Sequence, residues 1–231
     1  MLIANTGPNI TKTTVKIFLD TADTEVIKER LGYGLIDGIT TNPSLILKSG
    51  RDPADVYQEL IDMNIPDISM EVVGSYSKMK VDALQLISDF GNRQVTIKVP
   101  CTPDGLKVCY ELSQLGIRVN VTLIFSLAQA ILSAKAGATY VSPFVGRYDD
   151  NSISGLELIR SITETYLRQG VRTQVLAASL RDVYKVSRCF YNGASVVTMP
   201  PKIFDKMFTH ILTDKGLELF DEDYNATLTM L

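Results

Sequence analysis

Short runs rich in Val and Ile alternate with longer segments of helical period from residue 15 onward, and this alternation constrains the fold most. Parallel strands cannot be joined by tight turns and need long, usually helical, crossovers, so the pattern indicates a parallel sheet. We expect eight strands, at 15–20, 37–41, 68–73, 94–100, 118–123, 138–144, 173–179 and 194–200. We expect eight helices, at 23–31, 52–63, 77–90, 103–115, 125–136, 153–169, 181–190 and 201–211.

Eight such units in a chain of 231 residues predict an α/β protein, a single-domain (β/α)8 TIM barrel. The alternative is a doubly wound open sheet, but the glycine patterns GxGxxG and GxxxxGK[ST] are absent from the sequence. We assign the barrel to residues 15–212 and a flexible extension to residues 1–14. Residues 213–231 carry apolar side chains three and four apart, which predicts a C-terminal helix packed on its own barrel or at an oligomer interface.

Composition restricts the possible partners. The net charge of −3 offers no basic field for a nucleic acid, and no apolar run reaches the length of a membrane span. The three cysteines lack CxxC spacing and His210 is the only histidine, so we expect no metal site and a reducing, cytoplasmic location. His210 itself, which has no partner motif, is expected to be structural or solvent-facing.

Strand parity predicts which polar side chains enter the barrel. In 94–100, Val95, Ile97 and Val99 share one face, and Lys98 lies on the other with Thr96. If the apolar faces pack on helices, the inward set near the carboxyl ends of four strands is Asp20, Glu71, Lys98, Asn120 and Thr122. Any one of these is simply explained as a paired core contact. A buried lysine among carboxylates from separate strands is costly and points instead to chemistry.

An inward lysine in such a site is a candidate nucleophile towards a carbonyl. It reacts only as the neutral amine, which desolvation favours and neighbouring carboxylates oppose. The carboxylates also supply the proton carriers that imine chemistry needs.

With these residues in place, the chain resembles the transaldolase family, in particular its short form that includes the bacterial fructose-6-phosphate aldolases. The similarity covers about residues 16–200. The segments that carry it are IFLDTAD (17–23), GITTNPS (38–44), ISMEVVG (68–74), VTIKVPCTPDGL (95–106), NVTLIFSLAQA (120–130), YVSPFVGRYDD (140–150) and VLAASLRD (175–182). One TNPS would be weak evidence, but seven segments in family order are specific.

The resemblance implies a role for each matching residue. Lys98 would form the Schiff base, Asp20 would be the general acid/base, and Glu71 with Thr122 would hold a catalytic water. The remaining positions would bind substrate: Asn42, Asn120 and Ser142 the dihydroxyacetone hydroxyls, Arg147, Arg181 and Ser179 the phosphate, with Phe144 beside them. From the residues alone, Asn42 before Pro43 is equally typical of a turn. Two arginines after neighbouring strands favour phosphate binding over surface charge.

Two positions bear on the branch of the family. The aldolase branch has Tyr and Gln where this chain has Phe144 and Glu71, as in the transaldolase branch. The resemblance therefore implies a homo-oligomeric transferase without cofactor, acting on phosphorylated ketoses and aldoses. Its reaction would convert sedoheptulose 7-phosphate and glyceraldehyde 3-phosphate to erythrose 4-phosphate and fructose 6-phosphate, in the pentose phosphate pathway.

Three other functions stay open from the sequence. The first is a fructose-6-phosphate aldolase, which would release the three-carbon fragment. The second is a phosphosugar isomerase or epimerase that uses Asp20 and Glu71 for proton transfer and Lys98 only as a charge. The third is a noncatalytic barrel that serves as a binding protein.

Overall fold

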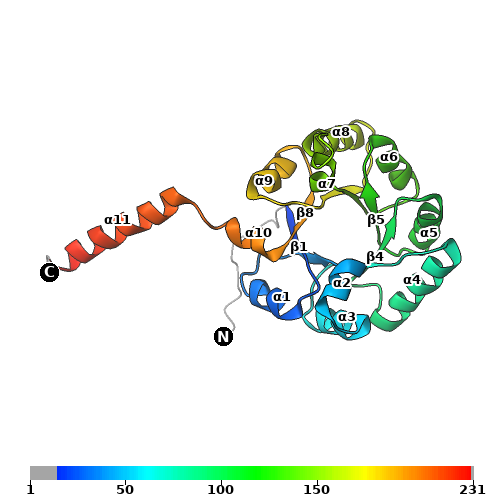
Figure 1. Cartoon of the computed structure of the whole chain (residues 1–231), viewed down its shortest axis with the longest axis horizontal. Coiled ribbons are helices and arrows are strands. Elements are labelled where there is room, and N and C mark those ends of the chain that lie inside the picture. Colours follow the sequence, from blue (N-terminus) through cyan, green and yellow to red (C-terminus); the bar gives the residue numbers. More distant parts are fainter. Residues whose placement is uncertain (1–14, 230–231) are drawn as a thin grey trace, which may run out of the picture.

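The computed structural model describes residues 15–229 and shows eight parallel strands closed into a barrel, with helices on the outside (Figure 1). The strands are β1 (Lys16–Asp20), β2 (Gly38–Thr40), β3 (Ile68–Glu71), β4 (Val95–Pro100), β5 (Val119–Ile124), β6 (Tyr140–Pro143), β7 (Gln174–Ala177) and β8 (Val196–Met199). They pair in chain order, and β8 pairs with β1. The predicted (β/α)8 barrel is confirmed, and the open-sheet alternative is wrong. The extension predicted at 1–14 lies outside the described residues.

Helices follow the strands as predicted, with two additions. The helices are α1 (Thr24–Leu31), α2 (Pro43–Ser49), α3 (Pro53–Asp62), α4 (Tyr76–Phe90), α5 (Pro103–Gln114), α6 (Leu127–Lys135), α7 (Val145–Asp149), α8 (Gly155–Arg168), α9 (Val183–Tyr191), α10 (Pro201–Lys206) and α11 (Ile211–Leu228). The pattern did not predict α2 and α7, which are too short to show a helical period. The predicted helix at 201–211 is wrong in its end, because α10 stops at Lys206.

Two separate apolar clusters show which way the strands face. Val95, Ile97 and Val99 belong to the large cluster between the barrel and its helices, as parity predicted for β4. A small inner cluster fills the barrel itself, from Phe18, Tyr140, Leu176, Ala178 and Val196, with Phe144 packed against it. The interior is therefore filled by side chains and is not a pore.

A polar network closes the amino-terminal end of the barrel. Asp67 is buried and accepts hydrogen bonds from Thr96 (2.7 Å), Arg118 (2.9 Å) and Tyr140 (2.8 Å). Burial raises the pKa of Asp67, and Arg118 and these hydroxyl donors oppose the rise. The network satisfies a buried carboxylate far along the strands from their carboxyl ends, which leaves that other end for function.

Strand β5 departs from the expected alternation. Its pairing with β6 shifts register between Val121 and Ile124, and Leu123 has a left-handed φ of 59°. Ile124 joins the outer apolar cluster, whereas a period of two continued from Val119 and Val121 predicts Leu123 in that place, so parity is wrong at this position. Asn120 and Thr122 precede the irregularity and keep their inward direction, with both side chains buried.

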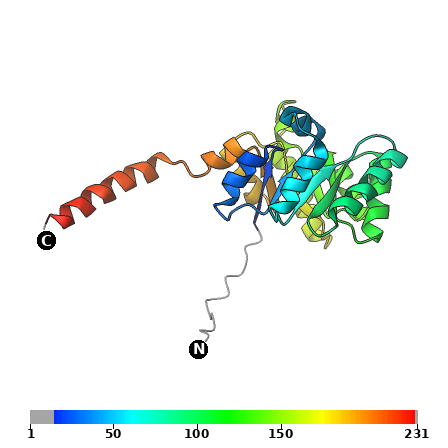
Figure 2. The same ribbon diagram turned by 90° about the horizontal axis from the view of Figure 1, so that it is seen from below.

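Helix α11 extends away from the barrel in both views (Figures 1 and 2). It begins at Ile211, two residues before the predicted start of the C-terminal helix, and none of its residues is buried. Leu217, Phe220 and Tyr224 are 56%, 67% and 64% exposed. The helix does not pack on its own barrel, so the first of its two expected positions is wrong.

The barrel interior is tight at Gly38, on β2. A Cβ atom there would lie 2.6 Å from the Asp67 carbonyl oxygen and 2.6 Å from the Phe18 ring. We expect Gly38→Ala to lower the free energy of unfolding by about 1–3 kcal/mol, because backbone and ring would both have to shift. Urea denaturation of Gly38→Ala and of Gly216→Ala, where a Cβ meets open space, measures the difference. Equal midpoints in the two variants would contradict the tight packing.

Candidate active site

A small pocket opens at the carboxyl-terminal end of the barrel, where the strands converge. It is lined by Asp20, Thr40, Asn42, Lys98, Thr122, Ser142, Phe144, Arg147, Ala178, Ser179 and Thr198. Eight of the eleven predicted site residues are in this set; Glu71, Asn120 and Arg181 contact its members or lie beside it. Active sites of this fold form at this end, from residues on several strands.

Lys98 is buried in the middle of the site. Its Nζ lies 3.0 Å from Glu71 Oε2 and donates a 2.9 Å hydrogen bond to the Thr41 carbonyl oxygen. Glu71, Lys98 and Asn120 are register partners on β3, β4 and β5, which sets the three side chains at one level. Only 6% of the Lys98 side chain and 9% of the Glu71 side chain are exposed, so water screens this ion pair weakly.

Asp20 ends β1 and is held by a chain of hydroxyl groups. Thr40 Oγ1 donates to Asp20 Oδ1 over 2.9 Å, and Thr198 Oγ1 lies 2.7 Å from Thr40 Oγ1. Burial raises the pKa of Asp20, while the Lys98 charge, the Thr40 hydrogen bond and Arg147 oppose the rise. A carboxylate with a raised pKa beside a buried lysine is suited to proton transfer near neutral pH.

Asn120 and Ser142 form a second polar group inside the barrel. Ser142 Oγ donates to Asn120 Oδ1 (2.7 Å), and Asn120 Nδ2 donates to Ser69 Oγ (3.3 Å). Thr122, on the same strand as Asn120, differs because its buried Oγ1 has no hydrogen-bond partner within residues 15–229. A buried hydroxyl of this kind needs an explanation, such as a partner that arrives with water or substrate.

Cationic and aromatic side chains line the mouth of the site. The Arg147 guanidinium lies 4.9 Å from the Phe144 ring centroid, and Phe144 packs edge-on against Phe125. Arg181 follows β7 and pairs through both terminal nitrogens with Asp150. This pair is half-exposed, so it contributes little to stability.

The backbone between the two arginines is held close. A Cβ at Gly146 would lie 2.2 Å from the Ser179 carbonyl oxygen, and the backbone amide of Gly146 donates to that oxygen over 3.0 Å. Ser179 has a left-handed φ of 59°. The contact fixes α7 against the loop after β7, and so fixes Arg147 relative to Arg181.

Asn42 proves to be a helix cap. Its Oδ1 accepts from the Leu45 amide over 3.0 Å at the start of α2, with Pro43 in the first helical position. The same residue lines the pocket, so its turn-like sequence context and its predicted place in the site are both observed.

Sequence reasoning missed Thr40, Thr198 and the Thr41 carbonyl oxygen. The two threonines lie on short strands, where parity is a weak signal, although Thr40 pairs in register with Asp20. A backbone carbonyl leaves no signal in side-chain identity at all.

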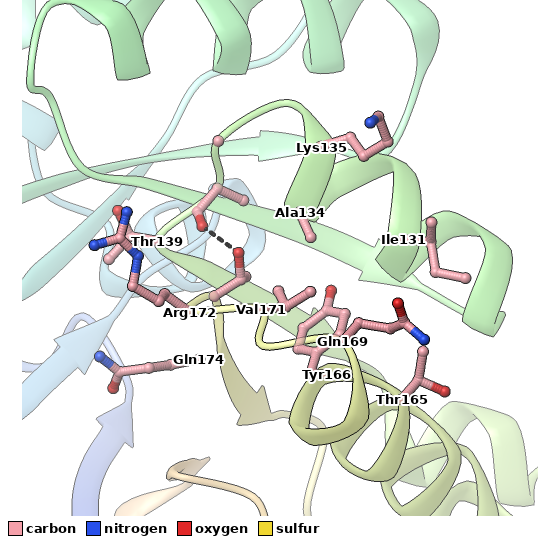
Figure 3. Close-up of a pocket in the computed structure, with 13 residues that line it drawn as sticks. Ile131, Ala134, Lys135, Thr139, Thr165, Tyr166, Gln169, Val171, Arg172 and Gln174 are labelled. Atoms are coloured by element: carbon pink, nitrogen blue, oxygen red, sulfur yellow. Dashed lines mark hydrogen bonds between the residues drawn. The ribbon is translucent and has the colours of Figure 1, made fainter.

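A cavity larger than the site pocket lies elsewhere. Figure 3 shows Lys135, Tyr166 and Arg172 among the residues around a space of about 780 Å³ between α6 and α8. Some of its lining residues, at 137–139 and 171–174, precede or begin β6 and β7. The cavity therefore opens at the amino-terminal end of the barrel, opposite the site pocket. None of the predicted site residues lines it. Size alone therefore does not identify the site of chemistry in this molecule.

Residues 15–229 carry no candidate metal centre and no candidate membrane span. No group of three or more His, Cys, Asp or Glu side chains is placed to hold a metal ion there. No helix in that range has both the length and the apolar character to cross a membrane.

The model of the transaldolase/fructose-6-phosphate aldolase family matches residues 17–231. The chain belongs to this family. Proteins named probable transaldolase from Paracoccus denitrificans and Erythrobacter litoralis are 49% and 48% identical to it, and each alignment covers 92% of this chain and 98% of the relative. A probable transaldolase of Cereibacter sphaeroides is 46% identical over 92% of this chain and 97% of its own length.

Membership in the transaldolase/fructose-6-phosphate aldolase family confirms the predicted resemblance and the predicted enzyme class. The family name covers both a transferase and an aldolase. Membership alone therefore does not decide between those two activities.

Removing only one member of the buried Lys98–Glu71 ion pair should destabilise the protein. We expect Lys98→Met to lower the free energy of unfolding by about 3 kcal/mol, because Glu71 would stay buried without its cation. Adding Glu71→Gln should recover part of that loss, and urea denaturation of the two single variants and the double variant measures the coupling. Lys78→Met, which breaks an exposed pair with Asp82, is the control and should cost about 0.5 kcal/mol or less. Additive effects of Lys98→Met and Glu71→Gln would show that the pair is not coupled.

Proposed function

We propose that this protein is a transaldolase, which transfers a dihydroxyacetone unit between sugar phosphates through a Schiff base on Lys98. One observation carries the proposal: a buried lysine amine lies at the carboxyl end of a barrel strand, against Glu71, with Asp20 in the same pocket. The reaction would convert sedoheptulose 7-phosphate and glyceraldehyde 3-phosphate to erythrose 4-phosphate and fructose 6-phosphate, as in the pentose phosphate pathway.

Imine formation needs the neutral amine. Glu71 Oε2, 3.0 Å from Lys98 Nζ, is placed to accept the ammonium proton as the ketose enters. The amine then attacks the C2 carbonyl, and the carbinolamine loses water. Thr122, whose buried hydroxyl has a free hydrogen-bonding capacity towards the site, would hold with Glu71 the water that carries these protons.

Cleavage follows on the iminium. Asp20 takes the proton of the C4 hydroxyl, the C3–C4 electron pair moves into the iminium, and C4 becomes the aldehyde carbonyl of the departing aldose phosphate. An enamine of dihydroxyacetone stays on Lys98. A second aldose phosphate enters, the enamine attacks its aldehyde carbon, and Asp20 returns a proton to the new C4 oxygen.

Substrate binding would use the two polar groups of the site. Asn42, Asn120 and Ser142 would hydrogen-bond the hydroxyls of the three-carbon unit, with Ser142 and Asn120 exchanging part of their mutual bond for substrate. Arg147, Arg181 and Ser179 would bind the phosphate at the mouth. A guanidinium suits this role because its planar fork meets two phosphate oxygens at once and stays charged.

Phe144 and Glu71 favour transfer over release. Phe144 lines the pocket, and its ring has no hydroxyl that could protonate the enamine. The fragment would then wait on Lys98 for an acceptor aldehyde. A fructose-6-phosphate aldolase is the alternative within the family; a phosphosugar isomerase or epimerase, with Lys98 only as a charge, is a more distant one.

Incubation with fructose 6-phosphate and borohydride tests the covalent step. We expect mass spectrometry to find a reduced dihydroxyacetone or hexose phosphate adduct on the Lys98 peptide, and Lys98→Ala to lose both the adduct and turnover, by a factor of about 10³ or more. Without acceptor, fructose 6-phosphate should give a burst of about one glyceraldehyde 3-phosphate per site and little free dihydroxyacetone.

The outcomes separate the candidate functions. Rapid release of free dihydroxyacetone without acceptor would assign the aldolase. Turnover without any adduct would favour the isomerase or epimerase mechanism, and retained activity in Lys98→Ala would do the same. Lys107→Ala, on the outer helix α5, is the matched control and should trap and turn over as the unaltered protein does.

We also infer that the protein is a cytoplasmic homo-oligomer in which α11 packs against a second copy of the chain. Support comes from its apolar residues, which find no cover on their own barrel: Leu217, Phe220 and Tyr224 are all exposed. An isolated helix of this kind is marginal in water without a packed face. The three cysteines are all free thiols, as a reducing compartment requires.

Replacing the apolar face of α11 tests that assembly. We expect Phe220→Ser combined with Tyr224→Ser to shift the mass measured by light scattering towards smaller species, because the contact would lose two large apolar side chains. Glu222→Gln, elsewhere on the same helix, should leave the mass unchanged. An unchanged mass in the double variant would place the oligomer contact on another surface.

A further inference from the structure

Three side chains that point into the barrel, from the neighbouring strands β1, β2 and β8, are joined in one chain of hydrogen bonds. Asp20 and Thr40 are register partners on β1 and β2, and Thr198 on β8 pairs in register with Phe18, two residues before Asp20. Thr40 and Thr198 are both 2% exposed. The two hydroxyls therefore lie on both sides of β1, next to its terminal carboxylate and away from bulk water.

The number of hydroxyl hydrogens fixes the direction of donation along this chain of hydrogen bonds. Thr40 has one hydroxyl hydrogen, which it donates to Asp20 Oδ1 (2.9 Å). The hydrogen between the two threonine oxygens (2.7 Å) must then come from Thr198. The order of donation is Thr198 to Thr40 to Asp20, and it ends on a single oxygen of the carboxylate.

The opposite direction of hydrogen-bond donation would need one more acceptor. If Asp20 carried its proton on Oδ1 and donated to Thr40, Thr40 would have to donate to Thr198. The Thr198 hydrogen would then need a new acceptor, and within residues 15–229 no other hydrogen bond of that side chain is seen. Asp20 Oδ2 accepts no hydrogen bond within residues 15–229, so it is the oxygen free to take up a proton without reversing this order of donation.

We propose that Thr198 is a positioning residue for the reaction: through Thr40 it holds Oδ1 of Asp20 as an acceptor and keeps Oδ2 as the oxygen that exchanges the proton with the substrate C4 hydroxyl. This inference rests on the role proposed above for Asp20. The proton balance is closed, because the C4 hydroxyl proton moves to Oδ2 on cleavage and returns from Oδ2 to the new C4 oxygen on transfer. Thr198 exchanges no proton with the substrate.

The charges around Asp20 set the sign of the expected effect. Lys98 on β4 and Arg147 on α7 face it and favour its ionised form, and Glu71 on β3 is paired with Lys98. The Thr40 hydrogen bond also favours the ionised form, and donation from Thr198 strengthens that bond by polarising the Thr40 hydroxyl. Loss of the Thr198 donor should therefore raise the pKa of Asp20 further.

Thr198→Val tests the proposal, because valine keeps the shape and removes the donor. We expect the burst of glyceraldehyde 3-phosphate from fructose 6-phosphate to slow by about 5- to 20-fold, a part of what a general base contributes, with KM nearly unchanged. The acid limb of its pH profile should move to higher pH. Borohydride trapping on Lys98 should keep its yield, since imine formation precedes the step that Asp20 performs.

Three further variants complete the experiment. Thr198→Ser restores the hydroxyl and should restore both the rate and the pH profile. Thr198→Cys offers a weak donor and should be intermediate, and it replaces Thr198→Val if the valine variant does not fold. Thr173→Val, which removes a hydroxyl at the other end of the barrel, is the matched control and should behave as the unaltered protein.

The possible results separate a role of Thr198 in catalysis, a role in packing and a failure of the proposed function. A burst rate and pH profile in Thr198→Val equal to those of the unaltered protein would overturn the role of Thr198 and leave the imine mechanism intact. A slower burst that serine does not restore would reduce Thr198 to a packing residue. Absence of both adduct and burst in the unaltered protein would overturn the proposed function, and the role of Thr198 with it.

Discussion

The ion pair between Lys98 and Glu71 is the interaction on which the site depends. Two charges with less than a tenth of their side chains exposed are expensive to hold, and a lone charge in that place is more expensive still. Register resolves the problem, because Lys98 is the direct neighbour of Glu71 on one side and of Asn120 on the other. Barrel closure thus supplies polar partners from separate strands at the same level, which no single segment of the chain could do.

The barrel interior keeps the polar side chains around Lys98 apart from a second polar group, the Asp67 network. Between them lies the inner cluster of Phe18, Tyr140, Leu176 and Val196. On its far side the Asp67 network is fully paired. Near the pocket, by contrast, the Thr122 hydroxyl has no hydrogen-bond partner within the described residues. Asp20 accepts a hydrogen bond through only one of its two carboxylate oxygens. Complete pairing is typical of a structural network, and unused capacity in a pocket is typical of a site that receives a ligand.

Much of this was predictable because strand parity is a local property. A period of two over 94–100 is enough to direct Lys98 inward, and the same holds for Asp20 and Glu71. The prediction failed where the backbone left that period, as at Leu123 with its positive φ. It also failed for α2 and α7, which are too short to show a helical period. Contacts such as Arg181 with Asp150 depend on how two loops meet, and no spacing within either loop encodes that meeting.

In the proposed mechanism two carboxylates serve one lysine, and their surroundings separate their tasks. Glu71 contacts the amine directly and can take or return its proton during imine formation. Asp20 acts on Lys98 only through its charge over a longer distance, and it accepts its hydrogen bond from Thr40. Its burial raises its pKa, which suits it to hold a substrate proton between cleavage and transfer. A single carboxylate in contact with Lys98 could not do both, because a proton taken from the substrate would then be free to pass to the amine.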